Sequence, residues 1–183
     1  MSLPSRPLTV TINGKTYGPL DVPEGLMMID VLHEMLGLTG SRLGCGQGIC
    51  HACVVIWDRD DRTSEEVQTC ITGAGFFDGK CIRTVEGIAQ RNDNGEVVAL
   101  SPVQQAFLEH FSFQCGYCTP GFVNAATVLV ERLKRAPIAR KDVEKTVVSA
   151  LESHICRCTG YVRYYQAVRD VILVTPGLTR DDA

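Results

Sequence analysis

The sequence lacks the features that mark membrane, exported or nucleic-acid-binding proteins. No apolar run approaches the roughly 18–20 residues of a membrane-spanning helix, and residues 1–7 carry no apolar signal segment. The formal net charge is −3 and the lysines and arginines are scattered, whereas nucleic acids are bound by basic patches. We therefore expect a soluble, cytoplasmic protein without a membrane span or a nucleic-acid partner. A periplasmic location requires export together with a signal-bearing partner.

Motifs for substrate chemistry are also missing. The chain has no G-x-G-x-x-G turn, no nucleophile triad and no carboxylate pair. Its charged stretch Asp58-Arg-Asp-Asp-Arg62 is typical of a solvated hairpin tip. We therefore expect any substrate chemistry to belong to a partner.

Cysteine, by contrast, is abundant, with nine in 183 residues. A first cysteine set has the spacing C-x4-C-x2-C followed by a more distant fourth member, and consists of Cys45, Cys50, Cys53 and Cys70. This spacing is typical of plant-type [2Fe–2S] sites. Glycines between and beside these residues let backbone N–H groups approach the sulfur atoms of an anionic cluster. The pattern predicts a [2Fe–2S] cluster here.

A second cysteine set combines a C-x2-C pair with a C-x-C pair, and consists of Cys115, Cys118, Cys156 and Cys158. Each pair comes just before a predicted helix, whose first turn offers unpaired N–H groups and a partial positive charge. Two such helix ends converging on four thiolates predict a second [2Fe–2S] cluster. Two clusters in one small chain indicate a device for transferring single electrons.

The sequence supports three other interpretations of these cysteines less well than iron–sulfur ligation. A disulfide scaffold suits a short secreted chain, and an odd number of cysteines fits it poorly. Zinc also accepts thiolate pairs at C-x2-C spacing, and the second set taken alone suits it better than the first. A redox-sensing C-x2-C beside an unrelated C-x-C is a further alternative.

The first half of the chain predicts a small mixed sheet around one helix. Strands over 8–12 and 15–22 are joined by a type I′ turn at Asn13-Gly14, and a helix over 28–36 ends at Gly37. A hairpin with strands over 52–57 and 65–70 follows, and then a strand over 81–85. This order is that of a β-grasp ferredoxin domain, which we place at residues 1–86.

The second half predicts helices only. A polar, turn-rich linker over 87–99 is followed by Ser101-Pro102, which starts a first helix, and Thr119-Pro120, which starts a second. A third helix is expected over 142–151 and a fourth from Thr159-Gly160. The order helix, cysteine loop, helix occurs twice. We therefore predict an α+β protein, with an all-α four-helix bundle over 100–175 and a tail over 176–183.

Three motifs give the chain a family resemblance. They are Gly44-Cys45-Gly-Gln-Gly-Ile-Cys50, Ser-Phe-Gln-Cys115-Gly-Tyr-Cys118-Thr-Pro-Gly121 and His-Ile-Cys156-Arg-Cys158-Thr-Gly-Tyr161. They closely resemble the iron–sulfur small subunits of the molybdenum hydroxylases, the family of xanthine oxidase, aldehyde oxidoreductase and isoquinoline oxidoreductase. The resemblance covers roughly residues 8–175.

The resemblance implies an electron-transfer subunit with two [2Fe–2S] clusters. Electrons would come from a molybdopterin cofactor, in its cytosine dinucleotide form, on a large catalytic subunit that oxidises aldehydes or N-heteroaromatic compounds. They would pass through the second set and then the first to an external acceptor, such as a FAD or cytochrome c subunit. The resemblance also implies that Gln114 and Cys158 contact the pterin.

Two alternatives for the whole chain remain at this level, a free-standing two-cluster ferredoxin and a zinc-binding interaction module. One departure from the family concerns His51, because the family usually has C-G-x-C where this chain has Cys50-His51-Ala52-Cys53. We expect His51 to face solvent, with contact to an unusual acceptor as the alternative, and not to be a cluster ligand. The leftover Cys81 is expected to be a small buried side chain in a strand.

Overall fold

The computed structural model describes residues 4–181 and begins with the expected hairpin. Strands β1 (Ser5–Ile12) and β2 (Lys15–Pro23) pair antiparallel, with Ile12 opposite Lys15. The two turn residues, Asn13 and Gly14, have φ of 54° and 80°, as a type I′ turn requires. The helix that follows consists of α1 (Met28–Asp30) and a π-helical turn η1 (Val31–Met35). It is followed by Gly37 in the left-handed region, which confirms the predicted stop.

The sheet of this domain has the order β2-β1-β5-β3-β4. Its remaining strands are β3 (Val54–Asp58), β4 (Ser64–Gln68) and β5 (Cys81–Arg83), with a 3₁₀ turn η2 (Ala74–Phe77) before β5. Strand β5 lies parallel to β1 and antiparallel to β3. Met28, Val31 and Leu32 of the helix share one apolar core with Leu8, Ile12 and Ile82 of the sheet. The predicted β-grasp arrangement is confirmed.

The segment between the domains has more structure than a simple linker. A 3₁₀ turn η3 (Val85–Gly87) leads into a short hairpin of β6 (Gln90–Arg91) and β7 (Val97–Ala99). Hydrogen bonds around Asn92 hold its turn. The polar composition that suggested a linker reflects this exposed hairpin, and the domain limits proposed above stay a prediction.

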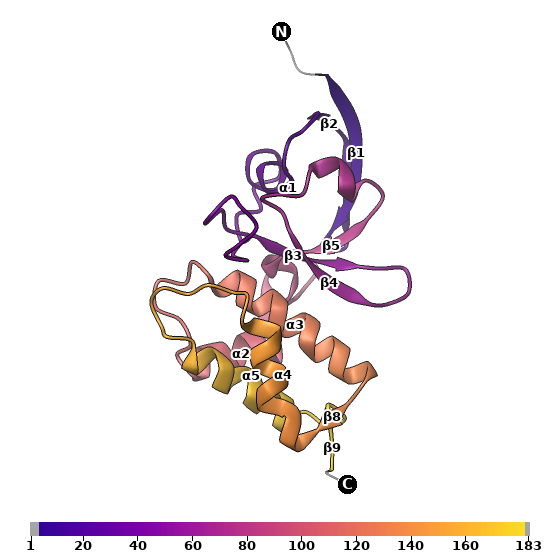
Figure 1. The fold of residues 1–183 in the computed structure, drawn as a ribbon. Coiled ribbons are helices and arrows are strands. Elements are labelled where there is room, and N and C mark those ends of the chain that lie inside the picture. The colour runs from indigo at the N-terminus through magenta and orange to yellow at the C-terminus, as the bar shows by residue number, and fades with distance from the viewer. Residues whose placement is uncertain (1–3, 182–183) are drawn as a thin grey trace.

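The second half forms the four expected helices, α2 (Pro102–Glu109), α3 (Thr119–Arg135), α4 (Val143–Leu151) and α5 (Val162–Val174) (Figure 1). Ser101 caps α2 in a reciprocal capping box with Gln104. Helix α5 starts later than predicted, because Gly160 and Tyr161 are both left-handed, with φ of 67° and 70°. Helix α3 is followed in the chain by β8 (Ile138–Ala139) and then by the 3₁₀ turn η4 (Arg140–Asp142). Strand β8 pairs with β9 (Thr179–Arg180) near the C-terminus.

Helix α3 joins the two domains by packing against β3 and β4 (Figure 1). The Asn124 side chain donates a hydrogen bond to the Val54 carbonyl at 2.8 Å. Arg83 of β5 forms ion pairs with Asp58 of β3 and with Glu131 of α3. Polar contacts therefore fix the helical domain on the sheet. Within the described residues, no helix is long and apolar enough to cross a membrane.

Candidate iron–sulfur centres

The first cysteine set lies on the loop between η1 and β3, with its fourth member after β4. The Cys45 sulfur accepts hydrogen bonds from the backbone N–H groups of Gln47, Ile49 and Cys50, each at 3.4 Å. Gly46 and Gly48, with φ of 66° and 70°, give the loop the tight curvature that aims these groups at one sulfur. The hydrogen bonds, led by that of Gln47, lower the pKa of Cys45 to about 6. The loop thus stabilises a thiolate.

The other two members of the first set are buried. Cys53 and Cys70 pack with Ile29, and burial, followed by effects of the neighbouring Cys70, raises the pKa of Cys53 to about 12. A thiol in this position stays protonated in the free protein, but a coordinated metal deprotonates it outright. An anion-stabilising loop and a buried thiol pair at the spacing of one ligand set suit a metal cluster, because iron supplies the positive charge that the buried pair lacks.

The second cysteine set comes from two loops of the helical domain. Cys115 and Cys118 lie between α2 and α3, and Cys156 and Cys158 lie between α4 and α5. The Cys115 and Cys158 sulfurs, one from each loop, are 3.6 Å apart. All four cysteines line one cavity of about 300 Å³. The structure therefore brings the C-x2-C and C-x-C pairs together, which speaks against a redox-sensing pair beside an unrelated one.

Two helix N-termini were expected beside the second set, but the structure places only one of them, that of α3, directly next to a cysteine. Cys118 directly precedes α3, as predicted, but Cys158 is separated from α5 by residues 159–161. At that end the Thr159 hydroxyl donates to the Cys156 sulfur at 3.1 Å. Although burial opposes it, this hydrogen bond lowers the pKa of Cys156. Burial and the neighbouring Cys156 raise the pKa of Cys118 to about 12. A side-chain hydroxyl here takes the role expected of a helix end.

The two cysteine sets are close neighbours. Cys45 and Cys50 line the same cavity as the second set. The Ile155 N–H donates to the Cys50 carbonyl at 3.1 Å, and the Tyr117 hydroxyl donates to the Leu43 carbonyl at 2.8 Å. All nine cysteines are free in this structure. Four thiols in each set fit the ligand requirement of a [2Fe–2S] cluster.

Comparison with known families agrees with this geometry. Residues 10–74 match the model of the 2Fe-2S iron-sulfur cluster binding domain, and residues 84–169 match that of the [2Fe-2S] binding domain. The chain is 38% identical to the nicotine 6-hydroxylase small subunit of Paenarthrobacter nicotinovorans over 89% of this chain and 87% of that protein. It is 35% identical to the nicotinate dehydrogenase small FeS subunit of Eubacterium barkeri, over 88% and 92% of the two chains. The chain belongs to the iron–sulfur subunits of the molybdenum hydroxylases.

A solved structure extends this likeness to the fold of these subunits. The crystal structure of quinoline 2-oxidoreductase from Pseudomonas putida 86 superposes with a TM-score of 0.75 at 30% identity, covering 96% of this chain and 94% of that chain. The predicted family and fold are confirmed. As an iron–sulfur subunit of a molybdenum hydroxylase, this chain is the electron-transfer part of an enzyme complex with a large catalytic subunit.

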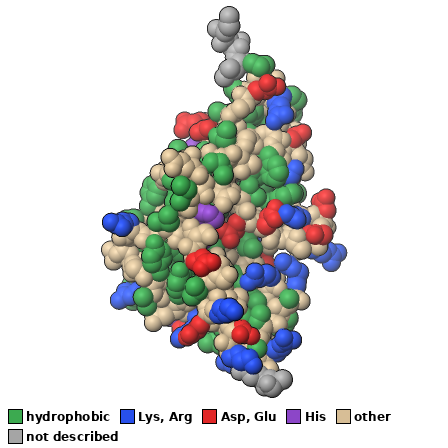
Figure 2. Space-filling model, in the orientation of Figure 1, with side chains coloured by type: hydrophobic (Ala, Val, Ile, Leu, Met, Phe, Trp, Pro, Cys, Tyr) green, Lys and Arg blue, Asp and Glu red, His purple; other side chains and the backbone are tan. Residues whose placement is uncertain are grey.

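In this iron–sulfur subunit the second set lies at the surface. Gln114, Cys115 and Cys158 are exposed, and the Gln114 side chain makes no hydrogen bond within residues 4–181. Figure 2 shows hydrophobic side chains gathered on the left of the molecule, the side on which the cysteine loops lie in Figure 1. Large apolar side chains exposed on these loops are those of Leu43, Ile49, Ile71, Tyr117 and Ile155. We call these five the loop-side apolar residues.

Two expectations about single residues were wrong. Cys81 lies in β5 as predicted but is exposed, because the neighbouring Ile82 takes the core side of the strand and side chains alternate between faces. His51 does not face solvent freely. It is half-buried, its Nε2 lies 3.1 Å from the Gln68 side-chain nitrogen, and its ring meets that of His154 edge-on at 5.0 Å. Burial, followed by the neighbouring His154, lowers the pKa of His51.

The exposure of Cys81 leads to a prediction. Cys81→Ala should retain both clusters and change the free energy of unfolding by no more than about 0.5 kcal/mol, because surface substitutions away from special features have small effects. The measurement is iron content together with the thermal midpoint under anaerobic conditions. Loss of iron would mean that Cys81 is a ligand and that one member of the first set is misassigned.

Proposed function

We propose that the first cysteine set holds one [2Fe–2S] cluster and the second set another, so that the subunit carries electrons from a molybdopterin centre to an external acceptor. The observation that carries this proposal is the shared cavity wall, where all four members of the second set lie beside Cys45 and Cys50. Each cluster, when bound, supplies one-electron redox chemistry. The chain itself supplies thiolate ligands and backbone N–H donors.

The exposed side of the second set is the proposed entry side. Gln114 adjoins the ligand Cys115, is exposed, and has an unused side-chain amide with both donors and an acceptor. We propose that Gln114, together with Cys158, contacts the pterin of the large subunit. The loop-side apolar residues would be covered by that subunit, since clustered exposed apolar side chains mark protein interaction sites. They favour a complex over a free-standing ferredoxin.

Three finer points belong to the same proposal. The relatives include a nicotine 6-hydroxylase, a nicotinate dehydrogenase and a quinoline oxidoreductase, and also aldehyde oxidoreductases at similar identity. The substrate of the complex would therefore be an N-heteroaromatic compound or an aldehyde. The molybdopterin would be in the cytosine dinucleotide form. The acceptor would be a FAD or cytochrome c subunit.

Metal content tests the cluster assignment directly. The chain purified without oxygen should contain about four irons and four acid-labile sulfides, because eight thiolates in two sets hold two [2Fe–2S] clusters. After reduction it should show two distinguishable EPR signals. A colourless protein that contains zinc and no iron would overturn the proposal in favour of a zinc-binding interaction module.

Substitution of Gln114 tests the entry side. Gln114→Ala should leave both clusters assembled but slow their reduction by substrate in the reconstituted complex, because a buried hydrogen bond to the pterin contributes about 1–3 kcal/mol. The expected slowing is about 5- to 150-fold, measured by stopped-flow absorbance. Gln47→Ala, a glutamine beside the first set, is the matched control and should reduce at the wild-type rate. Equal rates for both variants, with equal molybdopterin content, would remove Gln114 from the interface.

A further inference from the structure

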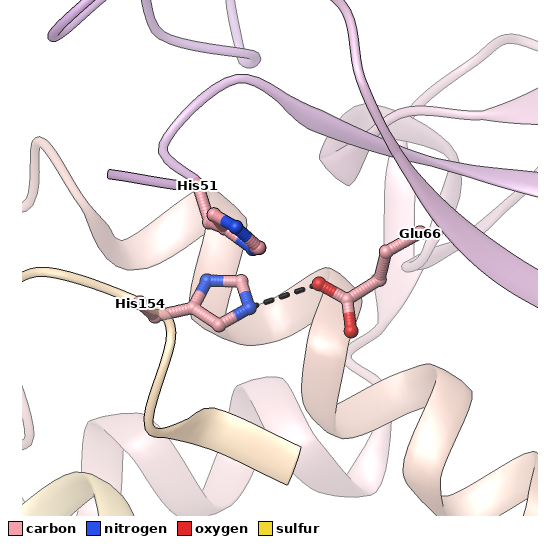
Figure 3. Close-up of side chains that lie close together, drawn as sticks. All are labelled: His51, Glu66 and His154. Carbon is pink, nitrogen blue, oxygen red and sulfur yellow. Dashed lines mark hydrogen bonds and ion pairs between the residues drawn. The ribbon is translucent and has the colours of Figure 1, made fainter. Parts of the chain in front are cut away.

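Three side chains that could bind a metal meet between the two domains, apart from the cysteine sets. They are His51 on the loop before β3, Glu66 on β4 and His154 on the loop after α4 (Figure 3). One ligand atom from each lies within 4.8 Å of the other two. In the figure the two imidazoles and the carboxylate point toward one another from three different segments. His51 and Glu66 belong to the first domain and His154 to the second, so the packing of the two domains brings the three side chains together.

The protein alone leaves this group incompletely satisfied. His154 is 2% exposed, and its Nε2 lies 2.9 Å from a Glu66 carboxylate oxygen. Its other ring nitrogen, Nδ1, is buried and has no hydrogen-bond partner in the described chain. His51 has only the Gln68 amide within hydrogen-bond distance of its Nε2. Two imidazoles and one carboxylate thus share two hydrogen bonds, and one buried ring nitrogen is left without a partner, which is uncommon for a buried polar atom.

The backbone around the group is shaped to hold it. His51 has φ of 57°, a conformation that suits glycine and is uncommon for a residue with a side chain. On α3, a β-carbon at Gly121 would lie 2.4 Å from the His51 carbonyl oxygen and 3.3 Å from His154 Nδ1. The helix therefore has a glycine where both histidine loops press against it. His51 thus keeps an unfavourable backbone conformation, and helix α3 has a glycine at the point of contact. Strain of this kind is often found at functional sites, which suggests a functional role for the His51 imidazole.

Two imidazoles and a carboxylate form a ligand set that zinc uses with a fourth position left open. Zinc bonds to nitrogen and oxygen are about 2.0–2.2 Å long, so two ligand atoms in a tetrahedral site lie about 3.3–3.6 Å apart. The ligand atoms of the three groups lie within 4.8 Å of one another, so metal binding requires the side chains to close by up to about 1.5 Å. They open onto a cavity of about 290 Å³, also lined by Gln68, Ser153 and Arg132, which leaves room for a water as fourth ligand.

We propose that His51, Glu66 and His154 form a binding site for a divalent transition metal ion, with Zn²⁺ as the natural occupant. His51 directly follows Cys50 of the first set, and His154 is two residues before Cys156 of the second. An ion here would tie the two cluster-bearing loops to β4 without sulfur ligands. Arg132 at the same cavity adds positive charge, so a bound anion is the competing outcome.

The test uses the whole chain with its clusters intact. Equilibrium dialysis against Zn²⁺ under anaerobic conditions, with zinc and iron counted by mass spectrometry, should give about one zinc in addition to the four irons proposed above. X-ray absorption at the zinc edge should show only nitrogen and oxygen neighbours near about 2.0–2.1 Å, and no sulfur at about 2.3 Å. The absence of sulfur neighbours would distinguish zinc at this site from zinc bound to a cysteine set.

Three variants make the test specific. His51→Gly removes the imidazole at a position whose φ suits glycine, so its fold and iron content should be kept while zinc affinity falls at least tenfold. Glu66→Gln should have the same effect on zinc. His110→Gln is the matched control, since His110 lies 3.4 Å from the Asp170 carboxylate with no third ligand in the described chain, and it should bind zinc like the wild type.

Several results would overturn the proposal. They are the absence of zinc beyond the iron sites, a sulfur shell around the zinc, or equal zinc affinity in the wild type and His51→Gly. A site that binds phosphate instead, lost in Arg132→Gln and insensitive to His51→Gly, would assign the cavity to an anion. Because iron content is counted in the same samples, failure of the zinc site and failure of the cluster assignment are distinguishable.

Discussion

Cys156→Ser should abolish the EPR signal of the helical-domain cluster and leave the signal of the ferredoxin-domain cluster intact. The iron content should fall from about four to about two per chain, because a cluster that loses one thiolate ligand is no longer held by four. Cys156 is buried and accepts the Thr159 hydrogen bond. A serine hydroxyl in its place is a poor iron ligand, so only three thiolates remain to hold the cluster.

Cys70→Ser is the reciprocal variant and should remove only the ferredoxin-domain signal. Cys81→Ala, which lies outside both sets, serves as the control with both signals present. Far-ultraviolet circular dichroism should show that each variant keeps its helices and strands. If either serine variant loses both signals while it remains folded, the two clusters do not assemble independently, and the contact between the Cys50 and Ile155 loops would be the place to look for the coupling.

Arg83→Met should lower the stability of the whole chain by about 2–3 kcal/mol. Arg83 pairs with Asp58 at 2.7 Å and with Glu131 at 2.8 Å, and its side chain is 25% exposed. Removing one partner of a fully buried pair costs about 3–5 kcal/mol, and partial exposure reduces that cost by screening. The thermal midpoint should fall by about 4–12 °C. Arg169→Met, which breaks exposed ion pairs with Glu144 and Asp170, is the control and should change it much less.

The same interface predicts how stability depends on pH. Burial opposes ionisation of Glu131, but the hydrogen bonds from Arg83 outweigh it and lower the pKa of Glu131. A carboxylate with a lowered pKa stabilises the fold above its unfolded pKa of about 4.3 and loses this contribution as the pH falls through the folded value. The stability difference between wild type and Arg83→Met should therefore shrink on acidification below about pH 4. A difference that stays constant would show that the pair contributes packing and not charge.

Local pattern in the sequence accounts for most of the fold. The Asn13-Gly14 turn, the Gly37 stop, the Ser101 cap and the Thr119-Pro120 start each lie where predicted, because a turn or cap depends on a few adjacent residues. The late start of α5 was missed because Gly160 was interpreted as a helix start, although its backbone is left-handed. The β8–β9 pairing was missed because two-residue strands carry no periodic signal.

The candidate site was predictable only in part. Spacing alone grouped the eight cysteines. The structure brings the second set to one cavity and, in the first set, places Cys45 beside Cys50 and Cys53 beside Cys70. The assignment of all eight as ligands stays a prediction. The orientation of Cys81 was wrong because a three-residue strand has no clear alternation to read. Glu66 and His154 were not singled out, since their meeting with His51 depends on how α3 sits on β3 and β4. A histidine in place of a family glycine was the available signal, and it lies on one of the three segments of the proposed site.

The contact between the two cysteine loops also has a consequence for hydrogen exchange. The Ile155 side chain is 46% exposed on a loop, yet its backbone N–H is bonded to the Cys50 carbonyl of the other domain. An amide in such a place exchanges with solvent only when the two loops part, because no helix or strand protects it. Deuterium uptake at Ile155 therefore reports the opening of the domain junction separately from the unfolding of either domain.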